Sequence, residues 1–238
     1  MQIEILTIFP EYFRTPLAES LLGKAIEAGV IDLTVTDLRS FATDRHRKVD
    51  DEPYGGGAGM VMMAPVLAAA IEARREPQGR PRAWTALLTP DGVPLVQRAV
   101  EALAARPRIL LVCGRYEGID ERARLLGLFD EEISLGDFIL PGGEAAALAV
   151  TEAVSRLVPG VVGRAESLEE ESFARERLDY PHYTRPREFR ALTVPDALLS
   201  GDHARIRRWR RARALERTTA RRPDLLEKRP EEPGEGEE

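Results

Sequence analysis

The chain has 238 residues, of which 43% are hydrophobic and 31% charged, and a formal net charge of −6 at pH 7. This composition is typical of a globular protein, and the length suits one large domain with a smaller one. The single cysteine, Cys113, excludes an internal disulfide, three histidines offer no zinc-binding spacing, and no apolar run reaches the ~20 residues of a membrane span.

The order of the predicted elements indicates an α/β fold. Residues 1–9 alternate like a strand and lack the pattern of a signal peptide, so we expect a cytoplasmic protein. Apolar runs predict strands at 3–9, 33–37, 84–88, 109–112 and 132–135. Helices are predicted at 16–28, 65–74, 94–104 and 144–158, with Pro16, Pro65 and Pro94 near their starts. Such alternation is typical of a mostly parallel sheet covered by helices.

The charge is distributed unevenly towards the end of the chain. Between Arg205 and Arg222 there are nine arginines and one acidic residue, in a helix that we expect to begin near Asp202. A segment of this kind favours an anionic partner. The last residues combine glutamate with proline and glycine, which predicts a disordered acidic tail.

Two glycine-containing loops each follow a predicted buried strand, at 113–120 and 135–144. Binding sites often form in the loop that connects a strand to the following helix. These two loops therefore predict two walls of one pocket. Neither loop matches a dinucleotide or phosphate-loop signature, and the third glycine segment, 55–59, lacks the lysine and hydroxyl residue of a phosphate loop. That third segment is either a flexible connection or a backbone cradle for a phosphate.

Four long motifs occur in one order: 50–60 (DDEPYGGGAGM), 113–122 (CGRYEGIDER), 136–144 (GDFILPGGE) and 181–186 (PHYTRP). Together they closely resemble the bacterial tRNA (guanine-N1)-methyltransferases that modify the guanosine at position 37, next to the anticodon. The resemblance extends over nearly the whole chain, from the first strand to residues 199–209. It implies a SPOUT methyltransferase fold, whose sheet carries a deep trefoil knot, followed by a small helical domain.

The resemblance also implies that S-adenosylmethionine binds in the knot, largely through backbone groups. The residues expected to contact it are Thr89, Pro90, Gly114, Tyr116, Glu117, Leu135, Gly136, Asp137, Phe138, Ile139, Leu140, Gly142 and Gly143. Glycine suits such a site because a residue without Cβ lets the chain approach a ligand closely. Two alternatives remain: Tyr116 as a packed core residue, and Glu117 as a partner of Arg115 or Arg122.

Methylation of guanine N1 needs a base for its proton and a donor for the charge that develops on O6. By resemblance, the base is Glu171 and the O6 donor is Arg156. The family usually has aspartate at the position of Glu171, so the longer glutamate is a departure from the family pattern. Glu169 or Glu170 is an alternative base. Arg156 has a structural alternative, since an arginine late in a helix offsets the helix dipole.

The tRNA, through its anticodon stem-loop, is the partner that the resemblance implies. Phosphate contacts are expected from the basic helix, and the guanine pocket from a region near the first glycine segment. The residues concerned are Arg207, Arg208, Arg210 and Arg211 in the helix, and His46, Arg47, Asp50, Gly55, Gly56, Gly57 and Gly59 near the pocket. Alternatively, these arginines pair with the acid-rich first domain or with the acidic tail. The resemblance further implies a homodimer with sites at the subunit interface, and help from Mg²⁺, for which the sequence places no ligands.

The predicted domains are a SPOUT-type S-adenosylmethionine-binding catalytic domain, 1–160, a linker carrying the base, 161–171, and a helical tRNA-binding domain, 172–238. Two other functions compete with the leading one. A different knotted RNA methyltransferase would act on ribose or another base, and ribose methylation would need no base for guanine N1. A catalytically silent RNA-binding protein would keep the fold, and Glu171 in place of aspartate is the feature that favours it.

Overall fold

The computed structural model describes residues 1–163, 171–173 and 177–227. The chain divides into two compact units, Met1–Gly163 and Arg164–Glu238. The acidic tail and most of the charged linker, including Glu169 and Glu170, lie outside the described residues. Within the described residues, no helix has the length and apolar character needed to cross a membrane.

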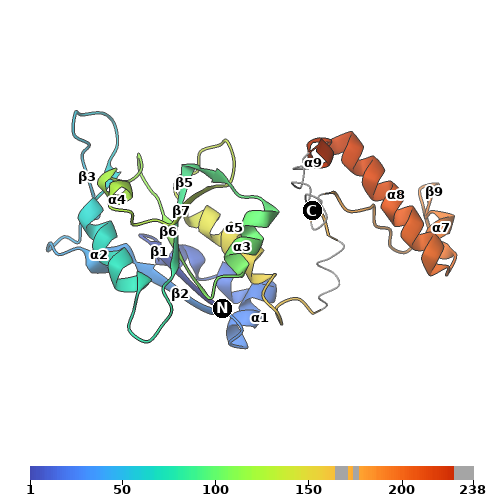
Figure 1. Ribbon diagram of the computed structural model, residues 1–238, viewed down its shortest axis with the longest axis horizontal. Coiled ribbons are helices and arrows are strands. Elements are labelled where there is room, and N and C mark those ends of the chain that lie inside the picture. Colours follow the sequence, from blue (N-terminus) through green and yellow to red (C-terminus); the bar gives the residue numbers. More distant parts are fainter. Residues whose placement is uncertain (164–170, 174–176, 228–238) are drawn as a thin grey trace, which may run out of the picture. The chain divides into compact units, whose positions relative to one another are not determined.

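A five-stranded parallel sheet forms the centre of the first unit (Figure 1), which confirms the predicted mostly parallel sheet. The strand order is β2-β1-β6-β5-β7, and every neighbouring pair is parallel. The strands are β1 (Gln2–Thr7), β2 (Asp32–Asp37), β5 (Trp84–Pro94), β6 (Arg108–Cys113) and β7 (Glu131–Ser134). Their carboxyl ends therefore meet at one edge of the sheet, where α/β proteins bind ligands.

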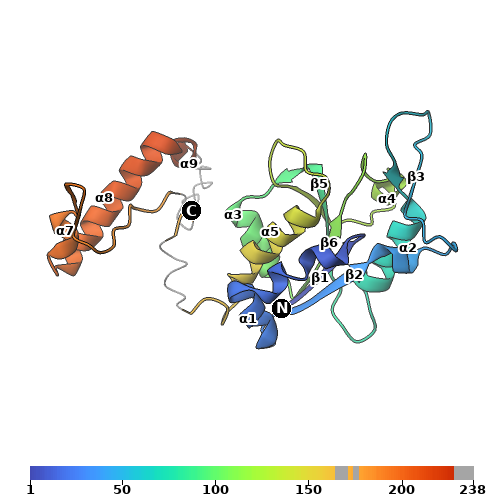
Figure 2. The same cartoon turned by 180° about the vertical axis from the view of Figure 1, so that it is seen from behind.

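Helices cover both faces of this sheet (Figures 1 and 2). One face is covered by α1 (Ser20–Glu27), α3 (Gln97–Ala104) and α5 (Glu144–Ser155), and the other by α2 (Ala64–Arg75) and α4 (Arg122–Leu125). Each face has its own apolar core. The central strand β6 shows this division, because Ile109 and Leu111 belong to one core and Leu110 and Val112 to the other. Burial on both faces explains why this strand is a continuous apolar run.

Short elements complete the first unit and change one predicted helix. They are the 3₁₀ turns η1 (Pro10–Phe13), η2 (Pro16–Ala18) and η3 (Leu38–Phe41), and a small antiparallel pair, β3 (Asp50–Asp51) with β4 (Val61–Met62). The predicted helix over 16–28 is wrong as one element, because it divides into η2 and α1. The turn packs on Gly23, where a Cβ would lie 2.5 Å from the carbonyl carbon of Ala18.

The prediction that Pro94 begins a helix is also wrong, since Pro94 ends β5 and α3 begins at Gln97. The ladder between β5 and β7 shifts its register between Leu88 and Val93, and then pairs Pro94 with Ser134. Gly92 permits this irregularity, because a Cβ there would lie 2.5 Å from the backbone of Ile133. A proline is tolerated here, because β5 pairs with β6 only as far as Leu88 and Pro94 follows the register shift.

The second unit consists of α7 (Asp196–Leu199), α8 (His203–Arg221), α9 (Asp224–Glu227) and the two-stranded pair β8 (Glu188–Phe189) with β9 (Leu192–Thr193). The prediction that the basic helix begins near Asp202 is confirmed. Asp202 caps α8, and its carboxylate accepts hydrogen bonds from the backbone N–H groups of Ala204 and Arg205 at 2.8 and 3.1 Å.

A buried ion pair at the amino end of the sheet provides a stability prediction. Glu4 and Arg108 have side chains that are 8% and 2% exposed, and their charged groups lie 3.0 Å apart. Thr36 also donates to Glu4 at 2.9 Å. Because Glu4→Ala leaves a buried guanidinium without its carboxylate, we expect the unfolding free energy to fall by about 3–5 kcal/mol. The unfolding free energy is measured by urea titration in a Trp209→Phe background, with Trp84 fluorescence as the signal.

Glu11→Ala is the matched control, since Glu11 pairs with Arg14 at 3.5 Å and both side chains are more than four-fifths exposed. That variant is expected to keep the wild-type midpoint, because exposed pairs contribute little. Equal midpoints for Glu4→Ala and Glu11→Ala would contradict the structural role of the buried pair.

Candidate methyl-donor pocket

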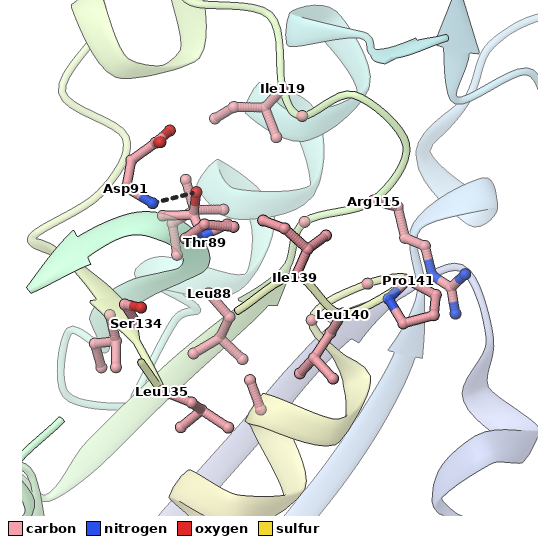
Figure 3. A pocket seen from close by; sticks show the side chains of 18 of the residues that line it. Leu88, Thr89, Asp91, Arg115, Ile119, Ser134, Leu135, Ile139, Leu140 and Pro141 are labelled. Atoms are coloured by element: carbon pink, nitrogen blue, oxygen red, sulfur yellow. Dashed lines mark hydrogen bonds between the residues drawn. The ribbon is translucent and has the colours of Figure 1, made fainter. Parts of the chain in front are cut away.

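A cavity of about 470 Å³ opens at the carboxyl ends of β5, β6 and β7, within the first unit. Figure 3 shows side chains from all three strand ends around this space, among them Leu88 and Thr89 from β5 and Leu135 after β7. The volume lies within the ~300–1,000 Å³ of ordinary ligand pockets. The two glycine-containing loops, 113–120 and 135–144, supply most of its wall, as the sequence predicted.

All but one of the predicted methyl-donor residues line this cavity. They are Thr89, Pro90, Gly114, Tyr116, Glu117, Leu135, Gly136, Phe138, Ile139, Leu140, Gly142 and Gly143. The exception is Asp137, which is exposed and is not among the lining residues. The sequence therefore anticipated which residues gather here, although they come from three separate segments of the chain.

The two loops contact each other backbone to backbone. The N–H of Gly143 donates to the carbonyl of Gly114 at 2.8 Å, and Arg115 and Gly142 form an isolated antiparallel bridge. A Cβ on Gly143 would lie 2.8 Å from the Cα of Cys113. Only glycine allows this approach. On the other side of Gly114, a Cβ would lie 3.0 Å from the carbonyl oxygen of Leu88, so the loop is also pressed against β5.

A buried ion pair holds the same crossing together. Glu144, the first residue of α5, is 1% exposed and lies 3.0 Å from the Nε of Arg115. Its other oxygen accepts from the hydroxyl of Thr7 at 2.8 Å, at the end of β1. The guanidinium of Arg115 also stacks on the ring of Phe9 at 4.4 Å, and its side chain runs past Pro141 (Figure 3). The carboxylate therefore joins β1 to both loops, at a helix start that favours negative charge.

The sequence analysis did not identify this ion pair. The signal was present, because Thr7 and Glu144 are polar residues at the boundary of apolar segments, but their partnership spans 137 positions. The alternative in which Glu117 pairs with Arg115 or Arg122 is wrong, because both arginines have other partners. Arg115 pairs with Glu144, and Arg122 pairs with Asp120.

Tyr116 and Glu117 lie at the wall of the cavity. Tyr116 is 44% exposed, so its interpretation as a packed core residue is wrong. Its backbone has a φ of 61°, which is rare for a residue with a side chain. Partial burial raises the pKa of the Tyr116 phenol, and the charge of Asp50 and a hydrogen bond to it raise the pKa further. The phenol therefore stays protonated at neutral pH and donates a hydrogen bond to Asp50.

Two further groups adjoin the cavity. Arg124 joins three segments near its edge, since its guanidinium lies 2.9 Å from Glu132, 3.0 Å from Glu121 and 3.3 Å from Asp91. This ion-pair cluster was also not predicted.

Cys113 is fully buried, and that burial, with the charge of Glu144, raises the pKa of its thiol well above the usual value. The thiol is therefore neutral, which argues against a role as nucleophile.

The residues predicted to shape a guanine pocket lie on the segment 44–60, next to β3 and β4. His46 is in a turn in which Asp44 accepts from the backbone N–H groups of His46 and Lys48, both at 2.8 Å. Asp50 begins β3, and its carboxylate faces the phenol of Tyr116. Four exposed glycines of this segment have positive φ: Gly55, Gly56, Gly57 and Gly59. This positive φ explains their identity, but by itself places no ligand.

The predicted catalytic pair is divided between the two units. Arg156 is the C-cap residue of α5 in the first unit, and Glu171 belongs to the second unit. The position of Arg156 suits the structural alternative, a charge at the helix end, as well as the catalytic one. Within the described residues, no group of three or more His, Cys, Asp or Glu residues has a metal-binding arrangement, so the implied role of Mg²⁺ gains no support.

In the basic helix α8, Arg207, Arg208 and Arg211 are exposed. Arg210 differs, because its guanidinium stacks on the ring of Tyr180 at 4.6 Å. Arg213 pairs with Glu216 at 2.6 Å in the same helix. These two contacts are internal to the second unit, and neither is a pairing with the first domain or the acidic tail.

Residues 1–228 of the chain match the family described as tRNA (Guanine-1)-methyltransferase TrmD. The chain belongs to this family. It is 57% identical to a tRNA (guanine-N(1)-)-methyltransferase of Chloroflexus aurantiacus over 226 residues, which are 95% of this chain and 88% of the relative. It is 54% identical to the enzyme of the same name from Anaeromyxobacter sp. over 230 residues, which are 96% of this chain and 91% of the relative. The cavity and its glycine walls are thus features of a member of the tRNA (guanine-1)-methyltransferase family.

Proposed function

We propose that the protein transfers a methyl group from S-adenosylmethionine to N1 of a guanosine in tRNA, at position 37 next to the anticodon. The observation that carries this proposal is the glycine-walled cavity at the carboxyl edge of the sheet, in a chain that belongs to this family. The names of the relatives support the reaction and the nucleic acid. The donor and the position in the tRNA rest on the resemblance of the four motifs.

The residues around the cavity fit the proposed donor. Gly114, Gly142 and Gly143 line the cavity and carry no side chain, so a ligand at this wall would meet the main chain directly. Apolar side chains such as Leu88 and Leu140 provide surface for an adenine ring. S-adenosylmethionine bound there supplies an electrophilic methyl carbon on a sulfonium.

We further propose that the crossing of the two loops is part of a trefoil knot. The support is the hydrogen bond from Gly143 to Gly114 and the ion pair of Arg115 with Glu144, which hold residues 114–115 and 142–144 against each other. A true knot is so rare that general topology rules argue against one. The family resemblance outweighs that prior, and the glycines explain how two chain segments pass so closely.

In the proposed mechanism the chain's own residues act on the guanine. The carboxylate of Glu171 would take the N1 proton, and the N1 lone pair would then bond to the methyl carbon as the bond from that carbon to the sulfonium sulfur breaks, which leaves S-adenosylhomocysteine. Arg156 donates a hydrogen bond to O6, on which negative charge develops as the proton leaves. Glutamate retains the carboxylate of the usual aspartate, with one more methylene of reach.

The second unit is proposed to bind the tRNA backbone as a small helical domain. Exposed arginines on α8 (Arg207, Arg208, Arg211) supply cations at one helix surface. We also propose a homodimer, in which the donor pocket of one chain and the second unit of the other form each site.

A methyl-transfer assay tests the proposal. The full chain is incubated with methyl-labelled S-adenosylmethionine and two unmodified tRNA transcripts, one with guanosine at position 37 and one with adenosine there. We expect 1-methylguanosine in the first and no label in the second. Label on a ribose or on another base would indicate a different RNA methyltransferase, and tRNA binding without any transfer would indicate an RNA-binding protein.

The proposed base has a matched pair of variants. Glu171→Gln keeps the shape of the side chain but cannot accept the N1 proton, so we expect turnover to fall by at least about 100-fold while the affinity for S-adenosylmethionine is unchanged. Glu170→Gln makes the same change at the neighbouring position and is expected to keep turnover. If Glu170→Gln loses turnover and Glu171→Gln keeps it, Glu170 is the base instead.

Charge reversal tests the basic helix. Arg208→Glu combined with Arg211→Glu is expected to weaken tRNA binding by at least about tenfold and to flatten its salt dependence, because phosphate contacts release counterions. Arg14→Glu combined with Arg98→Glu changes the net charge equally at two exposed positions of the first unit. Similar tRNA affinity in the two double variants would contradict a specific role for α8.

A further inference from the structure

Residues 89–92 of β5 form a bulge at the rim of the donor cavity. In the ladder between β5 and β7, Leu88 and Val93 both pair with Ile133, so the residues between them lie outside the ladder. The first three residues of the bulge line the cavity. Because the ladder does not include the bulge, the position of this part of the cavity wall depends on other contacts.

The side chain of Arg124, in α4, joins the bulge to neighbouring elements. Its guanidinium lies 3.3 Å from the carboxylate of Asp91, in the bulge, and 2.9 Å from that of Glu132, in β7. A third carboxylate, that of Glu121, lies 3.0 Å away. Arg124 also lines the cavity, and its side chain is 23% exposed, whereas that of Asp91 is 76% exposed. Two carboxylates thus anchor the guanidinium, and the third connects it to the bulge.

We propose that Arg124 is a positioning residue for the donor cavity and that it acts through Asp91. The ion pair of these two residues keeps the bulge in the arrangement that binds the donor. Without the pair, the bulge leaves this arrangement for part of the time, and the apparent donor affinity falls in proportion. The effect reaches about fivefold at most, because a pair with one exposed partner contributes little. The inference rests on the proposed donor site.

Two of the carboxylates provide a matched pair of variants. Asp91→Asn and Glu121→Gln each remove one carboxylate partner of Arg124 and change the net charge equally. Asp91 lies in the bulge, whereas Glu121 is the N-cap residue of α4 and lies outside the lining residues of the cavity. The Asp91 and Glu121 side chains are 76% and 66% exposed, so both variants are expected to fold. A difference between them therefore reports on the bulge and not on the charge near the cavity.

The first experiment follows hydrogen–deuterium exchange of the full chain, without any ligand. After correction for intrinsic rates, we expect Asp91→Asn and Arg124→Gln to speed exchange at the amides of residues 91–93 by about threefold to fivefold. Glu121→Gln is expected to keep the wild-type rate. Wild-type exchange in both Asp91→Asn and Arg124→Gln would overturn the proposed hold on the bulge, whether or not the cavity binds a methyl donor.

The second experiment measures S-adenosylhomocysteine binding by calorimetry at low ionic strength. Asp91→Asn and Arg124→Gln are each expected to raise the dissociation constant by about threefold to fivefold at unchanged stoichiometry, and Glu121→Gln is expected to leave it unchanged. The double variant of Asp91→Asn with Arg124→Gln is expected to lose no more than either single variant, because both break the same pair. Losses that multiply would indicate two separate contacts with the ligand and would overturn the positioning role. Equal dissociation constants for Asp91→Asn and Glu121→Gln would also overturn it.

Steady-state kinetics separates positioning from a general loss of structure. For Asp91→Asn we expect the KM for S-adenosylmethionine to rise by about threefold to fivefold and kcat to stay unchanged, because a saturating donor keeps the wall in place. A lower kcat with an unchanged KM would overturn the proposal. Absence of S-adenosylhomocysteine binding to the wild type would instead contradict the proposed donor site, which the exchange experiment does not presuppose.

Discussion

Two glycine-containing loops touch each other, backbone against backbone, at the carboxyl edge of the sheet, and the donor cavity depends on this contact. Gly143 lies so close to Cys113 and Gly114 that any side chain would separate the loops. The same crossing places Gly114 against the carbonyl oxygen of Leu88 and begins α5 at Glu144. The three strand ends, the cavity wall and the start of a core helix are thus positioned by one close approach.

The buried carboxylate of Glu144 adds a polar constraint to that approach. Removing a charge from water is costly unless it is paired and hydrogen-bonded, and Glu144 meets both conditions through Arg115 and Thr7. Its partners come from β1 and from the first loop, so the pair is satisfied only when the strand, the loop and the helix are all in place. Such a carboxylate makes the geometry of the crossing specific, even where its net contribution to stability is small.

The cavity has a floor of regular elements, and some of the segments around it are exposed. The floor of the cavity is made by strand ends and α5, whereas Ile139 at its wall is 79% exposed and the glycine loop 55–59 is exposed throughout. Arg156 and Glu171, the proposed chemical groups, belong to separate units, so the proposed chemistry draws on both parts of the chain.

The sequence by itself determined the parallel sheet, the capped basic helix and, through its motifs, the family and a set of donor residues of which all but Asp137 line the cavity. These follow from local patterns: apolar strands, an N-cap aspartate at 202, and glycines in fixed spacing. It misplaced the start of α3 because the ladder between β5 and β7 continues to Pro94, and it joined η2 to α1 because the packing on Gly23 is not visible in a pattern. Only the tertiary structure decided that Glu144 pairs with Arg115 and Thr7, and that Asp91 pairs with Arg124. Such contacts join residues far apart in the chain, and a carboxylate carries no local sign of which distant partner will share its burial.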